Sequence, residues 1–475
     1  MNNPTGMVAL VMAAGKGTRM GSARPKVLHE ISGEPLLGFV LSTLGKLRKL
    51  GWIDRVIVIV GHGAEQVRNY LHHNWPWAEY VEQMPQLGTG HAVHAAAKAL
   101  EGFGGTVFIL SGDVPLLRVE LLQELAEVHR TADAQLTLLT VNNPTPDGYG
   151  RILRGLDGKL SGIVEQRDAN SSQRAISEIN AGIYLAQWPV LQEALGMLGT
   201  ANDQGEYYLT DAIAHLVRAG QRVATLETND IAATAGINTR TELVAASAEW
   251  RQRVCAYWLN RQVTIEDPAS TFIGPRVEIG PDTILEPAVQ LHGCTCIGAG
   301  CRIGSYTRLV DALIGNEVLI RASDIVESQI GDGTTVGPFA RLRDHVVVGE
   351  KARIGNFVEL KKVQFGDGAK AAHLTYLGDA QIGELANIGC GVVTCNYDGE
   401  RKHRTIIGPG AFIGTNNTLV APLEIGQEAY TAAGSTITEN VPAKALALGR
   451  ARQIIKEGWV MRRKNRLTTS RPSEV

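Results

Sequence analysis

Residues 273–309 read IGPRVEIGPDTILEPAVQLHGCTCIGAGCRIGSYTRL, and an aliphatic residue recurs at every sixth position. The recurring positions are Ile273, Ile279, Leu285, Leu291, Ile297, Ile303 and Leu309. This period matches neither an α-helix, with about 3.6 residues per turn, nor the alternation of a strand. It is typical of a hexapeptide repeat, in which three hexads form one coil of a left-handed parallel β-helix around an aliphatic interior.

The same period returns twice toward the C-terminus. It resumes at Ile330, Val336, Leu342, Val348, Ile354 and Leu360, and again at Ile407, Ile413, Leu419, Ile425, Thr431 and Ile437. The sequence therefore predicts an all-β left-handed parallel β-helix domain over residues 263–475. The polar end of this domain, residues 462–475, is expected to be a mobile tail.

The first half of the chain follows a different pattern. Strand-like apolar runs at 55–63, 105–115 and 134–141 alternate with helical patterns such as ELLQELAEVH (120–129). This alternation predicts a Rossmann-like α/β domain over residues 1–240, with a mostly parallel sheet covered by helices. Residues 239–262 contain no Gly or Pro, and this stretch predicts a helical arm, which we assign to the linker 241–262.

Composition limits the function classes. The chain has 475 residues, a net charge of −2 and six cysteines. This balance gives no sign of nucleic-acid binding, and no apolar run reaches the length of a membrane span. We expect small-molecule substrates, no membrane insertion and a cytoplasmic location. Cys294, Cys296 and Cys301 lie close in sequence, but the histidine or cysteine pair that a zinc site needs is missing nearby.

The segment VALVMAAGKGTRM (8–20) predicts a buried strand followed by a ligand-binding turn. Its glycines allow close backbone approach and its cations suit phosphate. The loop residues concerned are Ala13, Ala14, Gly15, Lys16, Gly17 and Arg19. Lys26 follows Pro25 on a stiff segment and is placed to stabilise charge during nucleotidyl transfer. The combination AAGKGTRM…PKVL resembles the signature of sugar-nucleotide pyrophosphorylases.

Other strand ends supply further candidate ligands. In LSGDVPLL the carboxylate of Asp113 can hold Mg²⁺ against phosphates, with Asn238 as a second ligand, although Asn238 is equally suited to cap the next helix. Gln83, Gly88 and Thr89, in EQMPQLGTGHA, suit the edge of a pyrimidine, with a Thr89 helix cap as the alternative. Candidate sugar contacts are Gly150, Glu165, Asn180, Tyr208 and Thr210.

Polar residues interrupt the hexads in the β-helix domain. GPFARLRDH, NFVELKKV and AAHLTYLGDA supply Arg343, Lys361, His373 and Tyr376, and NIGCGVVTCNYDGERKHRT supplies several more. Cations and a phenol suit a sugar phosphate, and a histidine near its ordinary pKa can deprotonate an attacking amine. The backbone N–H of Cys390 is a candidate oxyanion donor. The alternative is a turn histidine beside a solvated basic face.

Both halves together, with RLR, NFVELKK, HLTYLGD and CNYDG, resemble bacterial bifunctional N-acetylglucosamine-1-phosphate uridyltransferase/glucosamine-1-phosphate N-acetyltransferases. The resemblance implies acetyl transfer from acetyl-CoA to glucosamine 1-phosphate in the C-terminal domain. Uridylyl transfer from UTP, with Mg²⁺, then follows in the N-terminal domain and releases pyrophosphate. The product, UDP-N-acetylglucosamine, is a precursor for peptidoglycan and lipopolysaccharide. The resemblance also implies a homotrimer formed through the β-helix.

The resemblance assigns roles by motif. His373 is the acetyl-transfer base, and Lys26 and Arg19 act in uridylyl transfer. The expected nucleotide and sugar ligands are Ala13, Ala14, Gly15, Lys26, Gln83, Gly88, Thr89, Ser111, Gly112, Asp113, Gly150, Glu165, Asn180, Tyr208, Thr210 and Asn238, with Asp113 and Asn238 on the metal. The expected amino-sugar phosphate ligands are Arg343, Lys361, Tyr376, Asn387 and Lys402. The expected acetyl-CoA ligands are Cys390, Asn396, Tyr397, Thr415, Ala433 and Arg450.

Some positions depart from the family pattern. They are Met12 for leucine, Ser111 for tyrosine, Asp344–His345 for Pro-Gly, Cys390 for alanine and Thr415 for serine. Two other functions compete with the bifunctional enzyme. One is a pyrophosphorylase with a purely structural β-helix, against which His373, Lys361 and Arg343 argue. The other is a non-catalytic regulatory subunit, against which Lys26 and Asp113 argue.

Overall fold

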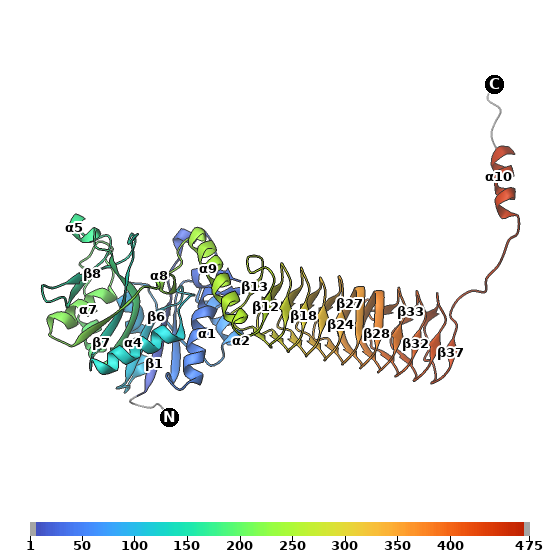
Figure 1. The fold of residues 1–475 in the computed structure, drawn as a ribbon, viewed down its shortest axis with the longest axis horizontal. Coiled ribbons are helices and arrows are strands. Elements are labelled where there is room, and N and C mark those ends of the chain that lie inside the picture. The colour runs from blue at the N-terminus through green and yellow to red at the C-terminus, as the bar shows by residue number, and fades with distance from the viewer. Residues whose placement is uncertain (1–5, 470–475) are drawn as a thin grey trace, which may run out of the picture. The chain divides into compact units, whose positions relative to one another are not determined.

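The computed structural model describes residues 6–469 and divides them into two compact units. The first contains the chain up to Cys296 together with Arg308–Asp311, and the second contains Ile297–Thr307 and the chain from Ala312 onward. The first unit thus includes the earliest β-helix coils as well as the α/β domain. Figure 1 shows both architectures, the sheet with its helices and the stacked coils.

The α/β domain is built on one sheet with the strand order β11-β7-β10-β6-β1-β4-β5. Its strands are β1 (Met7–Ala13), β4 (Arg55–Val60), β5 (Glu79–Glu82), β6 (Thr106–Ser111), β7 (Leu136–Asn142), β10 (Glu178–Gln187) and β11 (Val223–Thr228). All neighbours are parallel except β10, which runs antiparallel to β6 and β7. The hairpin β8 (Arg151–Arg154) and β9 (Leu160–Val164) extends from β10, and β2 (Glu30–Ile31) pairs with β3 (Glu34–Pro35).

Helices cover both faces of this sheet. Ala9 and Val11 of β1 pack in one core with α1 (Leu36–Lys49), α2 (Ala64–Asn74) and α4 (Val119–Thr131). Val8 and Leu10 pack in the other with α3 (Thr89–Ala95), α6 (Trp188–Gly196) and α7 (Leu209–Arg218). Since successive strand side chains point to opposite faces, a continuous apolar run fills both cores. The shorter helices are η1 (Thr18–Met20), η2 (Lys26–Leu28), η3 (Ala97–Leu100), α5 (Ser171–Arg174) and α8 (Ile231–Thr234).

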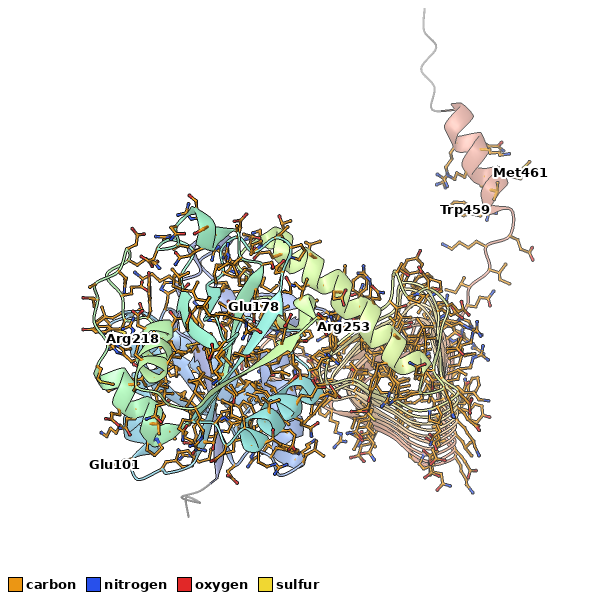
Figure 2. The ribbon with its side chains drawn as sticks, turned by 60° about the vertical axis from the view of Figure 1, so that its left-hand side comes forward. Glu101, Glu178, Arg218, Arg253, Trp459 and Met461 are labelled. Atoms are coloured by element: carbon orange, nitrogen blue, oxygen red, sulfur yellow. The ribbon has the colours of Figure 1, made fainter. Side chains whose placement is uncertain are left out.

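The expected helical arm is α9 (Arg240–Leu259). A capping box begins it, in which the Thr239 side chain accepts from the Glu242 N–H and Glu242 accepts from the Thr239 N–H. Arg253, labelled in Figure 2, pairs with Asp230 and Glu249 and fixes α9 on the α/β domain. Thr239, and not Asn238, is therefore the helix cap, so the Asn238 side chain is available for another role.

Each short β-helix strand between Thr264 and Val348 buries one aliphatic residue, as the hexads predict, and the two long strands that follow bury several residues each. Ile273 is in register with Leu291, and Leu291 with Leu309, so strands three apart in sequence stack directly. The strands are β12 (Thr264–Ile265), β13 (Phe272–Ile273), β14 (Glu278–Ile279), β15 (Ile284–Leu285), β16 (Gln290–His292), β17 (Cys296–Ile297), β18 (Arg302–Ile303), β19 (Arg308–Val310), β20 (Leu313–Ile314), β21 (Leu319–Ile320), β22 (Asp324–Val326), β23 (Gln329–Ile330), β24 (Thr335–Val336), β25 (Arg341–Arg343), β26 (Val347–Val348), β27 (Arg353–Phe365), β28 (Lys370–Ile382), β29 (Asn387–Ile388), β30 (Val393–Cys395), β31 (Thr405–Ile407), β32 (Phe412–Ile413), β33 (Thr418–Val420), β34 (Leu423–Ile425), β35 (Tyr430–Thr431), β36 (Thr436–Ile437) and β37 (Leu446–Ala447).

The end of the chain contains a final helix, α10 (Trp459–Thr469), which includes part of the segment expected to be a mobile tail. Trp459 and Met461 project from it in Figure 2, and both are exposed. Residues 470–475 of the expected tail lie outside the described residues. No helix within residues 6–469 combines the length and apolar character that crossing a membrane requires.

A buried ion pair joins the hairpin after Lys26 to the first β-helix coils, within the first unit. The Glu34 side chain is 2% exposed and accepts from Arg276 Nη2 at 2.8 Å and Nε at 3.0 Å. Tyr70 donates its hydroxyl to the other Glu34 oxygen, and Trp75 Nε1 donates to Tyr70 at 2.9 Å. Burial raises the pKa of Glu34, and the Arg276 charge opposes that rise.

Replacing Arg276 with methionine should destabilise this unit strongly, because it leaves a buried carboxylate without its cation. Removal of one partner of a buried pair costs about 3–5 kcal/mol. Since the pKa of Glu34 is raised in the folded state, the unfolding free energy of the variant should fall as pH rises from 5 to 8. Urea unfolding followed by tryptophan fluorescence at both pH values measures this. Adding Glu34→Gln should recover part of the loss, and an unchanged midpoint in the single variant contradicts the prediction.

Candidate active sites

The turn after β1 forms one wall of a cavity of about 450 Å³ in the α/β domain. Gly17 adopts φ +58°, and a Cβ there would lie 2.6 Å from the Lys26 Cβ, so only glycine lets Lys26 lie against the turn. Nine of the predicted ligands line this cavity, namely Ala13, Ala14, Gly15, Lys26, Gln83, Gly88, Thr89, Ser111 and Asp113. The glycine turn and the SGDVP segment thus contribute to one cavity.

Three residues far apart in sequence meet at one point beside this cavity. Lys26 Nζ forms an ion pair with Asp113 Oδ2 and donates to Asn238 Oδ1 at 3.0 Å. Ser111, which replaces the usual tyrosine, donates its hydroxyl to Asp113 Oδ1 at 2.6 Å. The strand order explains the meeting, since β1 pairs directly with β6 and the carboxyl ends of both strands lie at the same sheet edge.

The Asp113 carboxylate and the Asn238 amide oxygen fit a magnesium ion. Both oxygens already face a single cationic group, the Lys26 ammonium, so this point attracts positive charge. One carboxylate and one amide oxygen are hard ligands of the kind Mg²⁺ uses when substrate phosphates and water complete its shell. A bound Mg²⁺ would supply charge neutralisation for the phosphates.

Gln83 and Thr89, the side chains expected to contact a pyrimidine, both line the cavity. Gln83 follows β5, and its Nε2 donates to Gly88 O at 2.9 Å and lies 3.1 Å from His91 Nδ1. Thr89 does not cap α3, because its hydroxyl accepts from the Leu209 N–H at 3.1 Å and thereby ties α3 to α7. Gln83 thus presents a buried side-chain amide to the cavity, and Gln86 of the same segment also lines it.

The predicted sugar ligands form a group of their own. Thr210 donates to Glu165 Oε1 at 3.0 Å, and burial raises the pKa of Glu165. The Gly150 carbonyl accepts from the Asn180 N–H at 2.9 Å, and Tyr208 accepts from Gln204 at 2.7 Å. None of these predicted ligands belongs to the described lining of the 450 Å³ cavity.

Two further predicted residues differ in placement. The Gly112 N–H donates to the Met12 carbonyl at 2.9 Å and so holds Ser111 and Asp113 at the end of β1. Arg19 lies exposed on η1, and it is also absent from the described lining of the cavity. Lys16, whose charge suits phosphate, also lines the cavity, and so do Gln86 and Glu206, which were not predicted as ligands. Lys16 stands in the quoted turn, whereas sequence gives no signal for the other two.

His373 lies exposed on β28 beside a second cavity of about 560 Å³. Asn356 on β27 is its register partner, and His373 Nδ1 lies 2.8 Å from Asn356 Oδ1. Because an amide oxygen only accepts, Nδ1 carries the proton and Nε2 keeps a free lone pair. This tautomer is the one a general base needs. Asn356 was missed at the sequence level, although it stands 17 residues, one coil, before His373.

Several predicted acetyl-CoA ligands continue the column of residues above His373. Ala371 is in register with Ile388, Ile388 with Ile413, and Ile413 with Thr431. The residues two positions after each of these four therefore stack on successive coils. They are His373, Cys390, Thr415 and Ala433. The Cys390 carbonyl accepts from the Asn416 N–H at 2.7 Å, whereas the Cys390 N–H has no acceptor among the described residues. His373 and this N–H therefore lie on adjacent coils.

Two of the three remaining acetyl-CoA candidates lie in the loop between Cys395 and Thr405. Asn396 is buried and donates to Asp379 Oδ2 at 2.6 Å, and Tyr397 forms a bridge with Lys402. Arg450 is exposed beyond β37, and the described contacts do not join it to the column. This loop adds length to one coil, since Ile388 pairs with Ile413, 25 residues later.

Four of the five phosphate candidates, Arg343, Lys361, Tyr376 and Lys402, gather on another side of the same coils. Arg343 is in register with Lys361, and the nearby Lys402 ammonium, together with burial, lowers the pKa of Lys361. Tyr376 is in register with Glu359, whose Oε1 accepts from Arg343 Nε at 2.9 Å. Asn387 is in register with Lys370 and makes no described contact with this group. Two ammonium groups in contact favour an anion between them.

His373 makes no described hydrogen bond or ion pair with Arg343, Lys361 or Tyr376. It stands three residues before Tyr376 on β28, and the intervening Leu374 turns the chain with φ +45°. His373 and the phosphate candidates thus lie on two sides of one corner of the coil.

Loss of the hydrogen bond from His373 to Asn356 should slow acetyl transfer without weakening substrate binding. In Asn356→Ala the imidazole loses the acceptor that fixes its tautomer, and we expect kcat for acetyl transfer to fall about tenfold, within the usual effect of such outer hydrogen bonds. KM for both substrates should stay within about twofold. Release of CoA thiol measures both constants. Asn356→Asp keeps the acceptor and should keep most of the rate, and equal losses in the two variants contradict this prediction.

Asp344, which stands where the family pattern has a proline, places a carboxylate beside the phosphate candidates Lys361 and Arg343. Its Oδ2 lies 3.8 Å from Lys361 Nζ and 3.4 Å from Arg343 Nη1. A carboxylate there repels a phosphate, so Asp344→Asn should lower KM for glucosamine 1-phosphate by about threefold, in line with a partly exposed charge pair. The rise in affinity should disappear at high salt. An unchanged or higher KM at low salt contradicts this.

Comparison with known proteins agrees with this architecture. A family model for a MobA-like NTP transferase domain matches residues 9–180, and one for a bacterial transferase hexapeptide (six repeats) matches residues 327–362. The fold and sites thus define a nucleotidyltransferase domain joined to a hexapeptide-repeat transferase domain. The bifunctional protein GlmU of Shouchella clausii is 44% identical over 456 residues, which cover 96% of this chain and 99% of its own. The chain belongs to the GlmU family.

Other relatives agree in identity and coverage. The bifunctional protein GlmU of an Exiguobacterium species is 45% identical and is covered to 99%, and that of Synechococcus sp. (strain CC9605) is 45% identical and covered to 100%; each match spans 96% of this chain. A crystal structure of UDP-glucose pyrophosphorylase complexed with UDP-glucose matches at 15% identity with a TM-score of 0.43, covering 52% of this chain and 100% of its own, too low to show a common fold.

Proposed function

We propose that this protein makes UDP-N-acetylglucosamine in two steps, on two separate sites. The β-helix domain transfers acetyl from acetyl-CoA to glucosamine 1-phosphate, and the α/β domain transfers uridylyl from UTP to the resulting N-acetylglucosamine 1-phosphate. Membership of the GlmU family supports both activities. The single observation that supports two activities in one chain is that each domain has its own cluster of polar groups. In the α/β domain Lys26 contacts Asp113 and Asn238, and in the β-helix His373 lies one coil before Cys390.

Uridylyl transfer needs charge stabilisation more than covalent catalysis. The sugar-phosphate oxygen attacks the α-phosphorus of UTP in line with the departing pyrophosphate, and negative charge grows on both phosphate groups. The Lys26 ammonium and the N–H groups of the turn after β1 face that charge. Asp113 and Asn238 hold the Mg²⁺. Glu165 and Thr210 bind sugar hydroxyls, and Arg19 reaches the phosphates on substrate binding.

Acetyl transfer uses the column of residues on the β-helix. His373 Nε2 accepts the proton of the glucosamine amine as the nitrogen attacks the thioester carbon. The Cys390 N–H donates to the oxyanion that forms, and the oxyanion collapses with release of the CoA thiolate. Arg343, Lys361, Tyr376, Asn387 and Lys402 bind the phosphate and hydroxyls of the amino sugar. Asn396, Tyr397, Thr415, Ala433 and Arg450 bind acetyl-CoA.

A homotrimer is the proposed assembly, and an exposed apolar stripe supports it. Tyr306, Phe339, Phe357 and Leu374 stand at left-handed corners of the β-helix and are each more than half exposed. The Phe339 and Phe357 rings stack at 5.5 Å. Exposed apolar patches of this kind mark protein interfaces. Sedimentation should give a trimer, and the double variant Phe339→Glu, Phe357→Glu should lower its mass; a monomeric parent protein rejects the assembly.

A cytoplasmic location is also proposed. None of the six cysteines forms a disulfide in the described part of the chain, which suits a reducing compartment, and both co-substrates are cytoplasmic metabolites.

One coupled experiment tests the function. Purified protein is incubated with acetyl-CoA, glucosamine 1-phosphate, UTP and Mg²⁺, and thiol and pyrophosphate are measured separately. We expect both products, and EDTA should stop only pyrophosphate release. Pyrophosphate from pre-acetylated sugar without any thiol release would favour the alternative, a pyrophosphorylase with a structural β-helix.

A further inference from the structure

The amide group of Gln83 is held in one orientation by two hydrogen-bond acceptors. The residue is 3% exposed, and its Nε2 donates to the Gly88 carbonyl at 2.9 Å and lies 3.1 Å from His91 Nδ1 on α3. An amide nitrogen carries two hydrogens, and these two contacts use both. The Gln83 Oε1 has no donor within the described residues, although Gln83 lines the 450 Å³ cavity.

His91 is the acceptor of this pair whose role is unassigned. For Nδ1 to accept from Gln83, the imidazole must be neutral with its proton on Nε2. Burial, with a smaller contribution from the charge of His94, lowers the pKa of His91 and so favours the neutral ring. The Gly88 carbonyl is an acceptor in any state. With the His91 proton on Nε2, rotating the amide by a half-turn would break two hydrogen bonds and bring Oε1 against two acceptors.

We propose that His91 is a positioning residue that fixes the Gln83 carbonyl oxygen toward the cavity and so makes the enzyme select uracil over cytosine. Uracil has a donor at N3–H, which the fixed oxygen accepts. Cytosine has a lone pair at N3, which would face the oxygen lone pairs. This proposal rests on the uridylyl transfer proposed above. Thymine has the same N3–H as uracil, so the fixed oxygen does not distinguish these two bases.

Without His91, the Gly88 carbonyl alone would hold the orientation of the Gln83 amide less firmly. Without His91 one amide hydrogen lacks an acceptor, and rotation of the amide costs one hydrogen bond where it now costs two. The rotated amide then offers an N–H to the N3 of cytosine. A buried site built to accept a hydrogen bond rejects a ligand that lacks the donor by a large factor, because its polar group is left unpaired.

Packing is the competing explanation for His91. Its ring lies 6.3 Å from that of Tyr207 at an angle of 31°, so the side chain also fills space between α3 and the segment before α7. A packing role predicts loss of activity with both nucleotides alike. A positioning role predicts a change in the ratio between them, and rescue by any side chain that restores the acceptor.

The test compares kcat/KM for UTP and CTP, with N-acetylglucosamine 1-phosphate and Mg²⁺, in the full chain. His91→Leu fills similar space without an acceptor and should lower the UTP-over-CTP ratio about tenfold, the effect of roughly one net hydrogen bond. His91→Asn should restore the ratio, since its Oδ1 is bonded to Cγ like the Nδ1 of histidine. His94→Leu, an exposed neighbour on α3, is the matched control and should leave the ratio unchanged.

Each outcome is decisive. An unchanged ratio in His91→Leu, or an equal fall in His91→Leu and His91→Asn, overturns the role of His91. If His91→Leu is insoluble, His91→Ala gives the same readout. If the parent protein transfers acetyl but no uridylyl group, the proposed function of the α/β domain is wrong. If the parent protein transfers uridylyl but His91→Leu keeps the parental UTP-over-CTP ratio, only the role of His91 is wrong.

Discussion

Replacing His373 with alanine is expected to reduce acetyl transfer about 10³-fold, within the range of general-base catalysis. The variant loses the only imidazole in the column with Cys390, Thr415 and Ala433, and so the group that removes the proton from the amine. Because the residue is exposed and its only described side-chain partner is Asn356, the β-helix should fold normally. Thiol release from acetyl-CoA measures the loss.

Uridylyl transfer from pre-acetylated sugar provides the internal control for this variant. It should stay within about twofold of the parent rate, because His373 belongs to the other compact unit. His345→Ala, which removes an exposed histidine from the same β-helix, should change neither activity. Acetylation by His373→Ala at the parental rate would show that another group is the base.

Replacing Lys26 with methionine should have the converse effect, a loss of about 10³-fold in kcat for uridylyl transfer with acetyl transfer intact. Methionine keeps most of the stem and removes the ammonium that faces Asp113 and Asn238. Removing one donor aimed at developing charge costs about two to three orders of magnitude. Pyrophosphate release under saturating UTP and Mg²⁺ measures the effect.

Two comparisons separate catalysis from folding in this case. Lys98→Met, on the exposed surface of the same domain, should leave both activities unchanged. The uncompensated Asp113 carboxylate of Lys26→Met should raise the affinity of the site for Mg²⁺, which calorimetry with Mg²⁺ alone detects. A kcat within threefold of the parent value would remove Lys26 from the mechanism.

The period of the hydrophobic residues was sufficient to predict the β-helix. One aliphatic residue fills the interior on each side of a triangular coil, so the period of six follows directly from the geometry of the prism. The coil lengths were not predictable in the same way. Ile303 and Ile320 are 17 residues apart, Val336 and Ile354 are 18 apart, and Ile388 and Ile413 are 25 apart. These lengths decide which outward residues stack, and thus that Asn356 lies beside His373.

In the site of the α/β domain, too, the sequence predicted some features and not others. The apolar run before the glycine turn and the positions of Lys26 and Asp113 after stiff or buried segments predicted a phosphate site at a strand end. From the sequence, Asn238 was equally suited to cap a helix or to bind the metal. The structure makes Thr239 the cap and turns Asn238 toward Lys26, 212 residues away. Similarly, Thr89 binds the N-terminus of α7 and does not cap its own helix.

The sequence by itself determined the two architectures and the chemical types of both sites, because periodicity and turn residues act over a few neighbours along the chain. Only the tertiary structure decided which distant groups meet: Lys26 with Asp113 and Asn238, Gln83 with His91, and His373 with Asn356. Strand order and coil length set these meetings. Both result from packing of the whole domain, which no local pattern specifies.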